Sequence, residues 1–565
     1  MIPKLTAKGL ILSLIILTNC TYSQLTDVKD DFSKYYVDLP FEMPLLQTPK
    51  FPEKDFLVTN YGAIGDGLFK NTEAIQKAID ACTNAGGGRV VIPRGIWITG
   101  PIIIKNNVNL HLELGALLQF SKDFKDYPVI NAIYEGTMQL RCQSPISARN
   151  ANNIAITGDG VIDGGGDAWR YVKKFKLTAL QWKALVSSGG VVDKSGNNWW
   201  PSQSALDASI YIDEMTKKNQ KPDYELVRNS PEYLRPVMVN LISSKNILLD
   251  GPTFQNSPAW NIHPVMCENM IVRNITVRNP WYSQNGDGID LESCKNVIVY
   301  NSRFDVGDDA LCMKSGKNEE GRERGIPTEN IIIADCIVYH GHGGFVIGSE
   351  MSGGVRNIKV SNCQFIGTDI GLRFKSTRGR GGIVENIYID NIFMKDISTE
   401  AIGFNMFYGG FAPKEDKSAD DNSKTAQAVP VSEETPQFKN IFMNQVLCIG
   451  AENGLILQGL PEMSIKGIEL KNSIITANIG VSIYDAENIK IENTKIISNS
   501  GIPFNITNSK NVVFDTVESG DNETFFSIEG SKSSDIIIKG EGAEKLGSKV
   551  KFGNGASQNS IKIIK

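Results

Sequence analysis

The hydrophobic pattern along the chain consists of short runs in which aliphatic or β-branched residues alternate with polar ones. Each run opens with a charged or polar residue followed by asparagine, as in KNILLD at 245, ENMIVR at 268 and KNVIVY at 295. The pattern returns at residues 329, 356, 385, 439, 487 and 510. These runs have the composition of β-strands, and no helical period separates them. The sequence therefore predicts an all-β protein.

The spacing of the runs indicates how the strands are arranged. Successive asparagines from Asn246 to Asn386 are 23, 27, 34, 27 and 29 residues apart. These steps match solenoid coils and are too short for βαβ units. Short strands in such coils satisfy their edges only by stacking about 4.8 Å apart. We expect a right-handed, single-stranded parallel β-helix in which the asparagine amides bond from coil to coil.

Three segments depart from the repeat. Residues 71–85 have a helical pattern after a Gly-Asp-Gly turn, and we expect a helix that caps the N-terminal end of the solenoid. Two inserted loops interrupt the coils at residues 166–235, with a helical pattern near 176–188, and at residues 413–438. The first insertion carries four tryptophans, suited either to stacking on a sugar or to anchoring the insertion: Trp169, Trp182, Trp199 and Trp200. We expect residues 24–565 to form one domain.

Residues 1–23 have the features of a signal peptide. Lys4 and Lys8 precede an apolar run over residues 9–17 that is too short to span a bilayer. Cleavage after Ser23 and lipid attachment at Cys20 are both compatible with the residues that follow. We expect an exported protein, either periplasmic, anchored to the outer membrane as a lipoprotein, or secreted, with no membrane-spanning segment after signal removal.

Composition narrows the range of partners. The formal net charge of −5 argues against a general nucleic-acid or anionic-membrane binder, so we expect no nucleic-acid partner. The eight cysteines after Cys20 form no CxxC or CxxxC pair, which argues against a zinc or redox site. They suit buried core thiols, and we expect neither a metal nor a cofactor.

Residues able to perform chemistry gather in four consecutive coils. They are Asp287 in QNGDGID, Asp308 and Asp309 in VGDDALCMKSG, His342 in YHGHGG, and Arg373 and Lys375 in LRFKSTRGRGG. Each stands 12 to 18 positions after the asparagine that opens its coil, so we expect them on one side of the stack. Paired carboxyl groups can supply the acid and base that hydrolyse a glycosidic bond. Because Asp308 and Asp309 would face opposite ways on a regular strand, we expect a bulge or strand end there.

These motifs resemble those of glycoside hydrolase family 28, the polygalacturonases, including its exo-acting bacterial members. NGDGID is similar to the family's Asn-Thr-Asp motif, with Gly286 in place of Thr, and GDD, GHG and the Arg-Phe-Lys at 373–375 follow in the family's order. The resemblance extends from about Tyr61 through Lys395. It implies inverting hydrolysis of α-galacturonosidic bonds in a pectic polysaccharide or oligogalacturonide.

The resemblance also implies roles for the site residues. Asp308 is the expected general acid, with Asp287 and Asp309 holding the attacking water and His342 tuning the acid. Arg373 and Lys375 are expected to bind a uronate carboxylate. Apart from the resemblance, Tyr408, Asp290 and Lys314 suit either a contact with substrate or a structural role. For inversion we expect the carboxyl groups to lie roughly 6.5 to 9.5 Å apart. The two insertions offer material to close one end of the groove, which favours exo action.

Three alternatives stay open. A pectate-lyase-like enzyme would cleave by β-elimination with calcium and leave an unsaturated uronate. A rhamnogalacturonan or xylogalacturonan hydrolase would share the fold and overlapping acidic motifs. A non-catalytic pectin-binding β-helix would bind pectic fragments without generating reducing ends.

Overall fold

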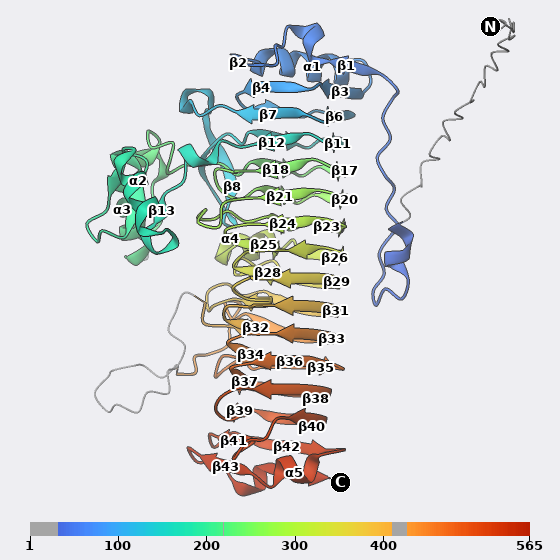
Figure 1. The fold of residues 1–565 in the computed structure, drawn as a ribbon, viewed down its shortest axis with the longest axis vertical. Helices are drawn as coiled ribbons and strands as arrows, with labels where there is room; N and C mark the ends of the chain where they lie inside the picture. Colours follow the sequence, from blue (N-terminus) through green and yellow to red (C-terminus); the bar gives the residue numbers. More distant parts are fainter. Residues whose placement is uncertain (1–31, 219, 409–426, 565) are drawn as a thin grey trace, which may run out of the picture. The chain divides into compact units, whose positions relative to one another are not determined.

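The asparagine runs form strands that stack on one another in parallel, in the order of the sequence (Figure 1). The computed structural model of the protein describes residues 32–218, 220–408 and 427–564. Met1–Leu39 and Pro40–Lys565 are separate compact units, and the described part of the first contains one 3-10 helix, η1 (Phe32–Tyr36). The stacked strands all belong to the second unit.

The first parallel sheet contains the asparagine runs. Ile247, Met270, Val297 and Ile331 share one register position in successive strands, and all four are buried. Burying each such side chain contributes roughly 1.5–3 kcal/mol, so this column holds the coils together. The main strands are β6 (Val108–Leu112), β11 (Asn152–Gly158), β17 (Lys245–Asp250), β20 (Glu268–Arg273), β23 (Lys295–Tyr300), β26 (Thr328–Ala334), β29 (Val355–Ile366), β31 (Ile383–Lys395), β33 (Gln437–Ile449), β35 (Ile465–Lys471), β38 (Ala486–Ser498), β40 (Lys510–Ser519), β42 (Ser534–Lys539) and β44 (Ile561–Ile564).

Each of the earlier coils adds a second, shorter strand to the same sheet. In β29, β31 and β33 the long and the short strand of the coil form one continuous strand. The separate short strands are β7 (Ala116–Phe120), β12 (Val161–Asp163), β18 (Thr253–Gln255), β21 (Thr276–Arg278), β24 (Arg303–Asp305) and β27 (Ile337–Val338). Because parallel strands joined in this way take right-handed connections, the coils form the predicted right-handed parallel β-helix.

A second parallel sheet of 14 strands closes the coils, and the motif residues lie on its strands or in the loops that lead into them. Its strands are β5 (Ile102–Ile103), β10 (Ile146–Arg149), β16 (Val239–Ile242), β19 (Ile262–Val265), β22 (Ile289–Glu292), β25 (Asp309–Lys314), β28 (Gly343–Ile347), β30 (Leu372–Lys375), β32 (Glu400–Asn405), β34 (Asn453–Gln458), β37 (Ile479–Tyr484), β39 (Phe504–Thr507), β41 (Phe526–Glu529) and β43 (Val550–Gly553). The order of β22, β25, β28 and β30 in the sheet brings the four motif coils side by side.

The recurrent asparagines form the predicted ladder. Asn246, Asn269, Asn296, Asn330 and Asn357 have φ between 53° and 59°, a left-handed conformation that asparagine tolerates better than most residues. The side-chain amides of the last four each donate to the side-chain oxygen of the asparagine one coil earlier, at 3.5, 3.2, 3.1 and 3.2 Å in order. The longest step, 34 residues, accommodates an extra helix, α4 (Asn318–Arg324).

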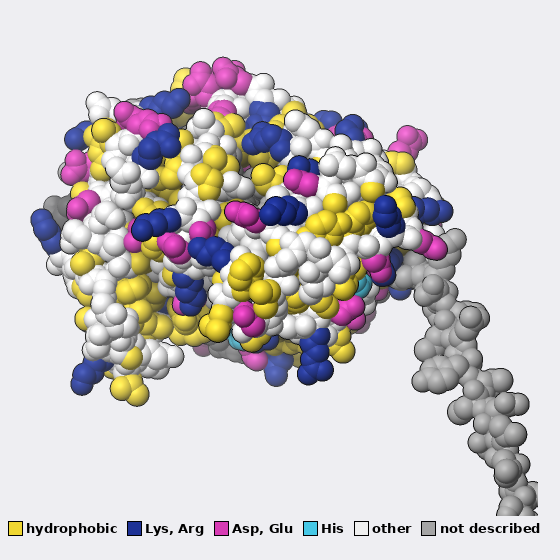
Figure 2. All heavy atoms as spheres, turned by 90° about the horizontal axis from the view of Figure 1, so that it is seen from above, with side chains coloured by type: hydrophobic (Ala, Val, Ile, Leu, Met, Phe, Trp, Pro, Cys, Tyr) yellow, Lys and Arg dark blue, Asp and Glu magenta, His cyan; other side chains and the backbone are white. Residues whose placement is uncertain are grey.

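Helices lie at both ends of the stack (Figure 1). The predicted cap is α1 (Thr72–Asn84), whose apolar face, including Ile75 and Ile79, is buried beside β3 (Gly88–Ile92). α5 (Ala543–Gly547) lies at the other end. Seen from the α1 end, basic and acidic side chains are interspersed over the surface (Figure 2), in keeping with the small net charge of −5.

The first insertion, residues 166–235, forms a layer beside the stack (Figure 1). Trp169 packs edge-on against Phe124 and Tyr127, at ring-centre distances of 4.6 and 4.9 Å, and Trp200 stacks on Tyr171 at 4.4 Å. Trp169, Trp199 and Trp200 are all buried, and Trp169 anchors the insertion to the rest of the unit, whereas Trp199 and Trp200 pack within it. Its elements are η4 (Gly166–Ala168), β13 (Val172–Lys173), η5 (Lys174–Lys176), α2 (Ala179–Ser187), β14 (Val191–Val192), β15 (Asn198–Trp200), α3 (Gln203–Lys217) and η6 (Tyr224–Val227).

Other sequence expectations have mixed outcomes. The eight cysteines after Cys20 are buried free thiols, as predicted. Most of the second insertion, residues 413–438, and the whole of the expected signal peptide, residues 1–23, lie outside the described residues. An antiparallel hairpin, β8 (Val129–Tyr134) and β9 (Thr137–Cys142), was not predicted. No helix in the described ranges has both the length and the apolar character needed to cross a membrane.

Candidate active site

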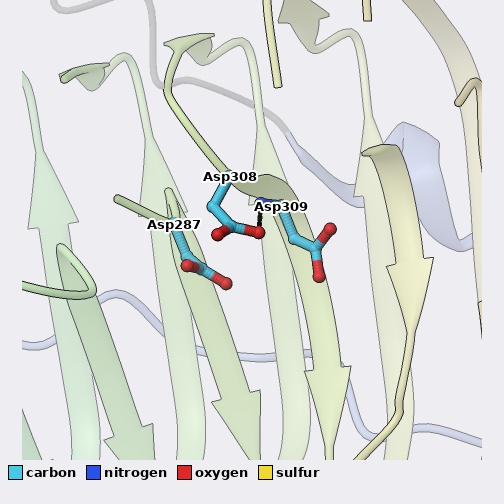
Figure 3. Close-up of side chains that lie close together, drawn as sticks. All are labelled: Asp287, Asp308 and Asp309. Atoms are coloured by element: carbon cyan, nitrogen blue, oxygen red, sulfur yellow. Dashed lines mark hydrogen bonds between the residues drawn. The ribbon is translucent and has the colours of Figure 1, made fainter. Parts of the chain in front are cut away.

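Three aspartates meet where strands of the second sheet begin. Asp287 lies two residues before β22, Asp308 immediately before β25, and Asp309 is the first residue of β25. The backbone N–H of Gly288 donates to the carbonyl oxygen of Asp309 at 2.9 Å, which aligns the two coils. Figure 3 shows the three side chains close together, and an oxygen from each lies within 4.8 Å of the others.

This spacing shows that the expected carboxyl separation of roughly 6.5 to 9.5 Å was wrong. The separation rule describes two carboxyl groups that flank a substrate from opposite sides. Here Asp308 and Asp309 are adjacent in the chain, and Asp287 stands one coil away, at about the 4.8 Å spacing of neighbouring strands. Carboxylates on neighbouring coils are therefore close whatever the stereochemistry, and their spacing does not predict it.

Glycines give the aspartates their positions. Asp308 precedes the strand and Asp309 begins it, which is the predicted strand end. A Cβ atom on Gly307 would clash with the Ser283 hydroxyl and lie 2.7 Å from the carbonyl oxygen of Pro280. A Cβ on Gly286 would also clash with the Ser283 hydroxyl. Ser283 thus fills the space beside Gly286, which explains why glycine stands where the resembling motif has threonine.

Two cations contact Asp309 from β30, two coils further along. Arg373 Nη1 lies 3.1 Å from Asp309 Oδ1, and Lys375 Nζ lies 2.6 Å from Asp309 Oδ2. The Tyr408 ring stands 4.9 Å from the ammonium of Lys375 and 5.7 Å from the guanidinium of Arg373. The structure therefore brings these three predicted residues together with the carboxylates. Among the described residues, the three aspartates lie close enough together to hold a metal ion. Arg373 and Lys375 already place two positive charges beside them.

His342, from the loop before β28, completes the predicted set. Its Nδ1 atom lies 3.2 Å from Asp308 Oδ1, and its Nε2 atom lies 3.6 Å from Asp369 Oδ2. Its other close neighbour, Lys176 of the first insertion, was missed by the sequence analysis, with Nζ 3.3 Å from His342 Nε2. No local motif marks Lys176, because 166 residues separate it from the histidine.

The three carboxyl groups have different proton affinities. Burial, reinforced by the neighbouring carboxylates, raises the pKa of Asp287 well above its ordinary value. Burial opposes ionisation of Asp308 as well, but the hydrogen bond from His342 and the nearby cations outweigh it and lower the pKa of Asp308. Lys375 and Arg373 likewise overcome burial and lower the pKa of Asp309. Of these three aspartates, Asp287 therefore has the greatest proton affinity in the free protein.

Asp290 and Lys314, named above as possible substrate contacts, are buried beside the site. Asp290 is fully buried, Lys314 is 3% exposed, and their charged atoms are 3.6 Å apart. Lys314 also bonds Glu350 at 3.0 Å and lies over the Trp260 ring at 4.7 Å. Because Ile289, Leu291 and Met313 point into the core, Asp290 and Lys314 lie on the outward strand face, where the site also lies. These contacts suit a structural role, and a contact with substrate stays a prediction.

A cleft of about 770 Å³ borders the loop that carries Asp287. Arg235, at the end of the first insertion, donates to the carbonyl oxygen of Gln284 at 2.6 Å and to Asn285 Oδ1 at 2.7 Å. The cleft lies between the hairpin β8–β9, the insertion and the start of α4. Its lining includes Tyr134, Arg141, Tyr171, Trp200, Arg235 and Lys317.

Comparison with known proteins gives concordant matches. The family model for glycosyl hydrolases family 28 matches residues 171–420. An exo-poly-alpha-D-galacturonosidase of Dickeya chrysanthemi is 31% identical over 359 residues, which are 62% of this chain and 57% of that protein. An endo-polygalacturonase of Pectobacterium carotovorum subsp. carotovorum is 29% identical over 336 residues, covering 58% and 70% of the two chains. A crystal structure of a hyperthermoactive exopolygalacturonase from Thermotoga maritima aligns with a TM-score of 0.66 at 31% identity, covering 81% of this chain and 96% of that one.

Proposed function

This chain belongs to glycosyl hydrolases family 28 and is a glycoside hydrolase, and from that premise we propose that it removes galacturonate units from the ends of pectic chains. The observation that carries the proposal is the pair of cations, Arg373 and Lys375, beside three clustered aspartates. The carboxyl groups supply acid and base, and the cations suit a sugar that bears a carboxylate.

Substrate binding exchanges one carboxylate partner for another. In the free protein Arg373 and Lys375 are paired with Asp309. The carboxylate of a galacturonate unit brings the same charge and geometry, so it competes for both cations and loosens their hold on Asp309. Tyr408, which is 38% exposed beside them, offers its ring to the same sugar.

The catalytic roles depend on which carboxyl group of the site holds a proton when substrate is bound. We assign Asp308 as the general acid and Asp287 with Asp309 as the pair that holds and deprotonates the attacking water. In the free protein burial raises the pKa of Asp287 and of Asp290 beside it, which favours protonation there, while the hydrogen bond from His342 and the cations lower the pKa of Asp308. A bound uronate offsets those cations, which raises the pKa of Asp308 and favours its protonated, acid form.

The first insertion supports attack at a chain end. Together with hairpin β8–β9 and α4 it walls the cleft beside the Asp287 loop. The wall carries basic and acidic side chains together, such as Lys317 and Glu135, and Tyr171 with Trp200 gives it an aromatic surface. A wall on one side of the carboxylates limits how many sugar units extend past the cleaved bond.

Export forms part of the same proposal, because a pectic polymer is an extracellular substrate. It is based on the basic and apolar pattern of residues 1–23. The mass of the mature N-terminus in protein recovered from the native host distinguishes cleavage after Ser23 from lipid attachment at Cys20.

Proton NMR of freshly digested polygalacturonate tests both the reaction class and its stereochemistry. Inversion at an α bond gives a β-configured reducing end, so the β-anomer signal should appear before mutarotation mixes the anomers. The signal of an unsaturated uronate should stay absent, and a calcium chelator should leave the rate unchanged.

Other NMR results would contradict particular parts of this account. An α-anomer formed first would indicate retention. An unsaturated product lost on chelation would indicate β-elimination, and binding without new reducing ends would indicate a non-catalytic protein. Turnover of rhamnogalacturonan or xylogalacturonan, but not of polygalacturonate, would show that the substrate is one of those polysaccharides instead.

A further inference from the structure

The first insertion places one ammonium group among the loops that carry the catalytic residues. Lys176, the last residue of η5, is 8% exposed. Its Nζ atom lies 3.3 Å from the carbonyl oxygen of Gly307, the residue before Asp308, and 3.5 Å from that of Trp281, in the loop that leads to Asp287. Its third neighbour is His342 Nε2, at 3.3 Å. One side chain therefore ties together loops from three successive coils.

The contact with His342 determines which ring nitrogen carries the proton. An ammonium group only donates hydrogen bonds, so His342 Nε2 must accept from Lys176. A neutral imidazole then carries its proton on Nδ1, which faces Asp308 Oδ1 at 3.2 Å. This tautomer donates a hydrogen bond to Asp308, the proposed general acid.

The charges around the ring explain why Lys176 is needed. Asp308 faces Nδ1, Asp369 faces Nε2 at 3.6 Å, and Arg373 donates to the backbone oxygen of His342 at 3.4 Å. Without Lys176, His342 could carry its proton on Nε2 and donate a hydrogen bond to the carboxylate of Asp369. The Nδ1 lone pair would then face the Asp308 carboxylate and repel it.

We propose that Lys176 is a positioning residue that holds His342 in the tautomer donating to Asp308, so that the first insertion forms part of the catalytic apparatus. This inference rests on the proposed hydrolysis for its kinetic consequence, although the tautomer itself is independent of substrate. Its influence passes through His342, and the side chain needs no contact with the sugar.

Histidine nitrogen NMR tests the tautomer directly, because the chain has only four histidines. The signals that disappear in the His342→Gln variant are those of the His342 ring. In the wild-type protein, with the imidazole neutral, we expect the Nδ1–H tautomer. Lys176→Met should shift the population toward Nε2–H, Lys176→Arg should retain Nδ1–H, and the exposed neighbour control Lys174→Met should change nothing. An unchanged Nδ1–H tautomer in folded Lys176→Met would overturn the proposal, whether or not the protein hydrolyses galacturonan.

Kinetics on oligogalacturonides provide the second test. Lys176→Met should lower kcat about 10- to 100-fold with KM within about twofold, the size of effect seen when a supporting partner is removed. Lys176→Arg should restore most of the rate. In an Asp308→Asn background, Lys176→Met should cost little more, because the acid it supports is already absent. Fully additive losses, or a loss confined to KM, would contradict a role exerted through His342 and Asp308.

Discussion

Replacing Asp308 by Asn should lower kcat on oligogalacturonides at least about 100-fold, the usual contribution of a general acid. The amide is nearly isosteric with the carboxyl group but cannot protonate the leaving oxygen. Asp308 Oδ1 also accepts the backbone N–H of Asp309 at 3.1 Å, and the amide oxygen can preserve that bond. The fold should therefore survive, and steady-state kinetics with thermal unfolding measures both quantities.

Asp305→Asn is the matched control, since Asp305 lies in the same coil with a half-exposed side chain. It should retain near-normal kcat. If folded Asp308→Asn also keeps near-normal kcat, Asp308 is not the acid. Asp287, whose raised pKa already favours the protonated form, then becomes the candidate.

Lys375→Met and Arg373→Met should each lower kcat/KM on free-acid oligogalacturonides on the order of 100-fold. Removing one partner of a buried charge pair costs about 2–5 kcal/mol, and these side chains are largely buried. The low-pH limb of kcat/KM should also move to higher pH. The two cations hold the pKa values of Asp308 and Asp309 down, and losing either lets those groups take up protons at higher pH.

Methyl-esterified oligogalacturonide separates substrate recognition from general damage. The wild-type enzyme should prefer the free acid, and both variants should lose much of that preference. Lys395→Met, which removes an exposed lysine, serves as the charge control. An unchanged preference with an unchanged pH profile would mean that Arg373 and Lys375 do not face the substrate.

The coil architecture could be predicted from sequence because it is a one-dimensional repeat. Asn246, Asn269 and Asn296 mark equivalent positions in successive coils, and stacking converts that periodicity directly into a ladder. The same reasoning brought Asp287, Asp308 and His342 together, since residues at a similar phase of neighbouring coils lie side by side.

Features that depend on irregular segments could not be predicted in this way. Lys176 reaches His342 across 166 residues from within an insertion that has no repeat phase. Ser283 fills the space above Gly286 through a loop conformation that no motif encodes. Asp290 and Lys314 lie on the outward strand face, and the burial of Lys314 comes from contacts with other coils, such as Trp260 and Glu350, that motif position alone does not determine.

The most direct test of the central claim follows polygalacturonate digestion by product size and viscosity together, with an endo-acting enzyme as comparator. A wall beside the carboxylates predicts cleavage at chain ends, so galacturonate monomer or dimer should be the earliest product while viscosity barely falls. The comparator should reduce viscosity steeply at the same number of new reducing ends. A similarly steep fall for this protein, with a ladder of mid-sized oligomers, would show an open groove and contradict the exo-acting assignment.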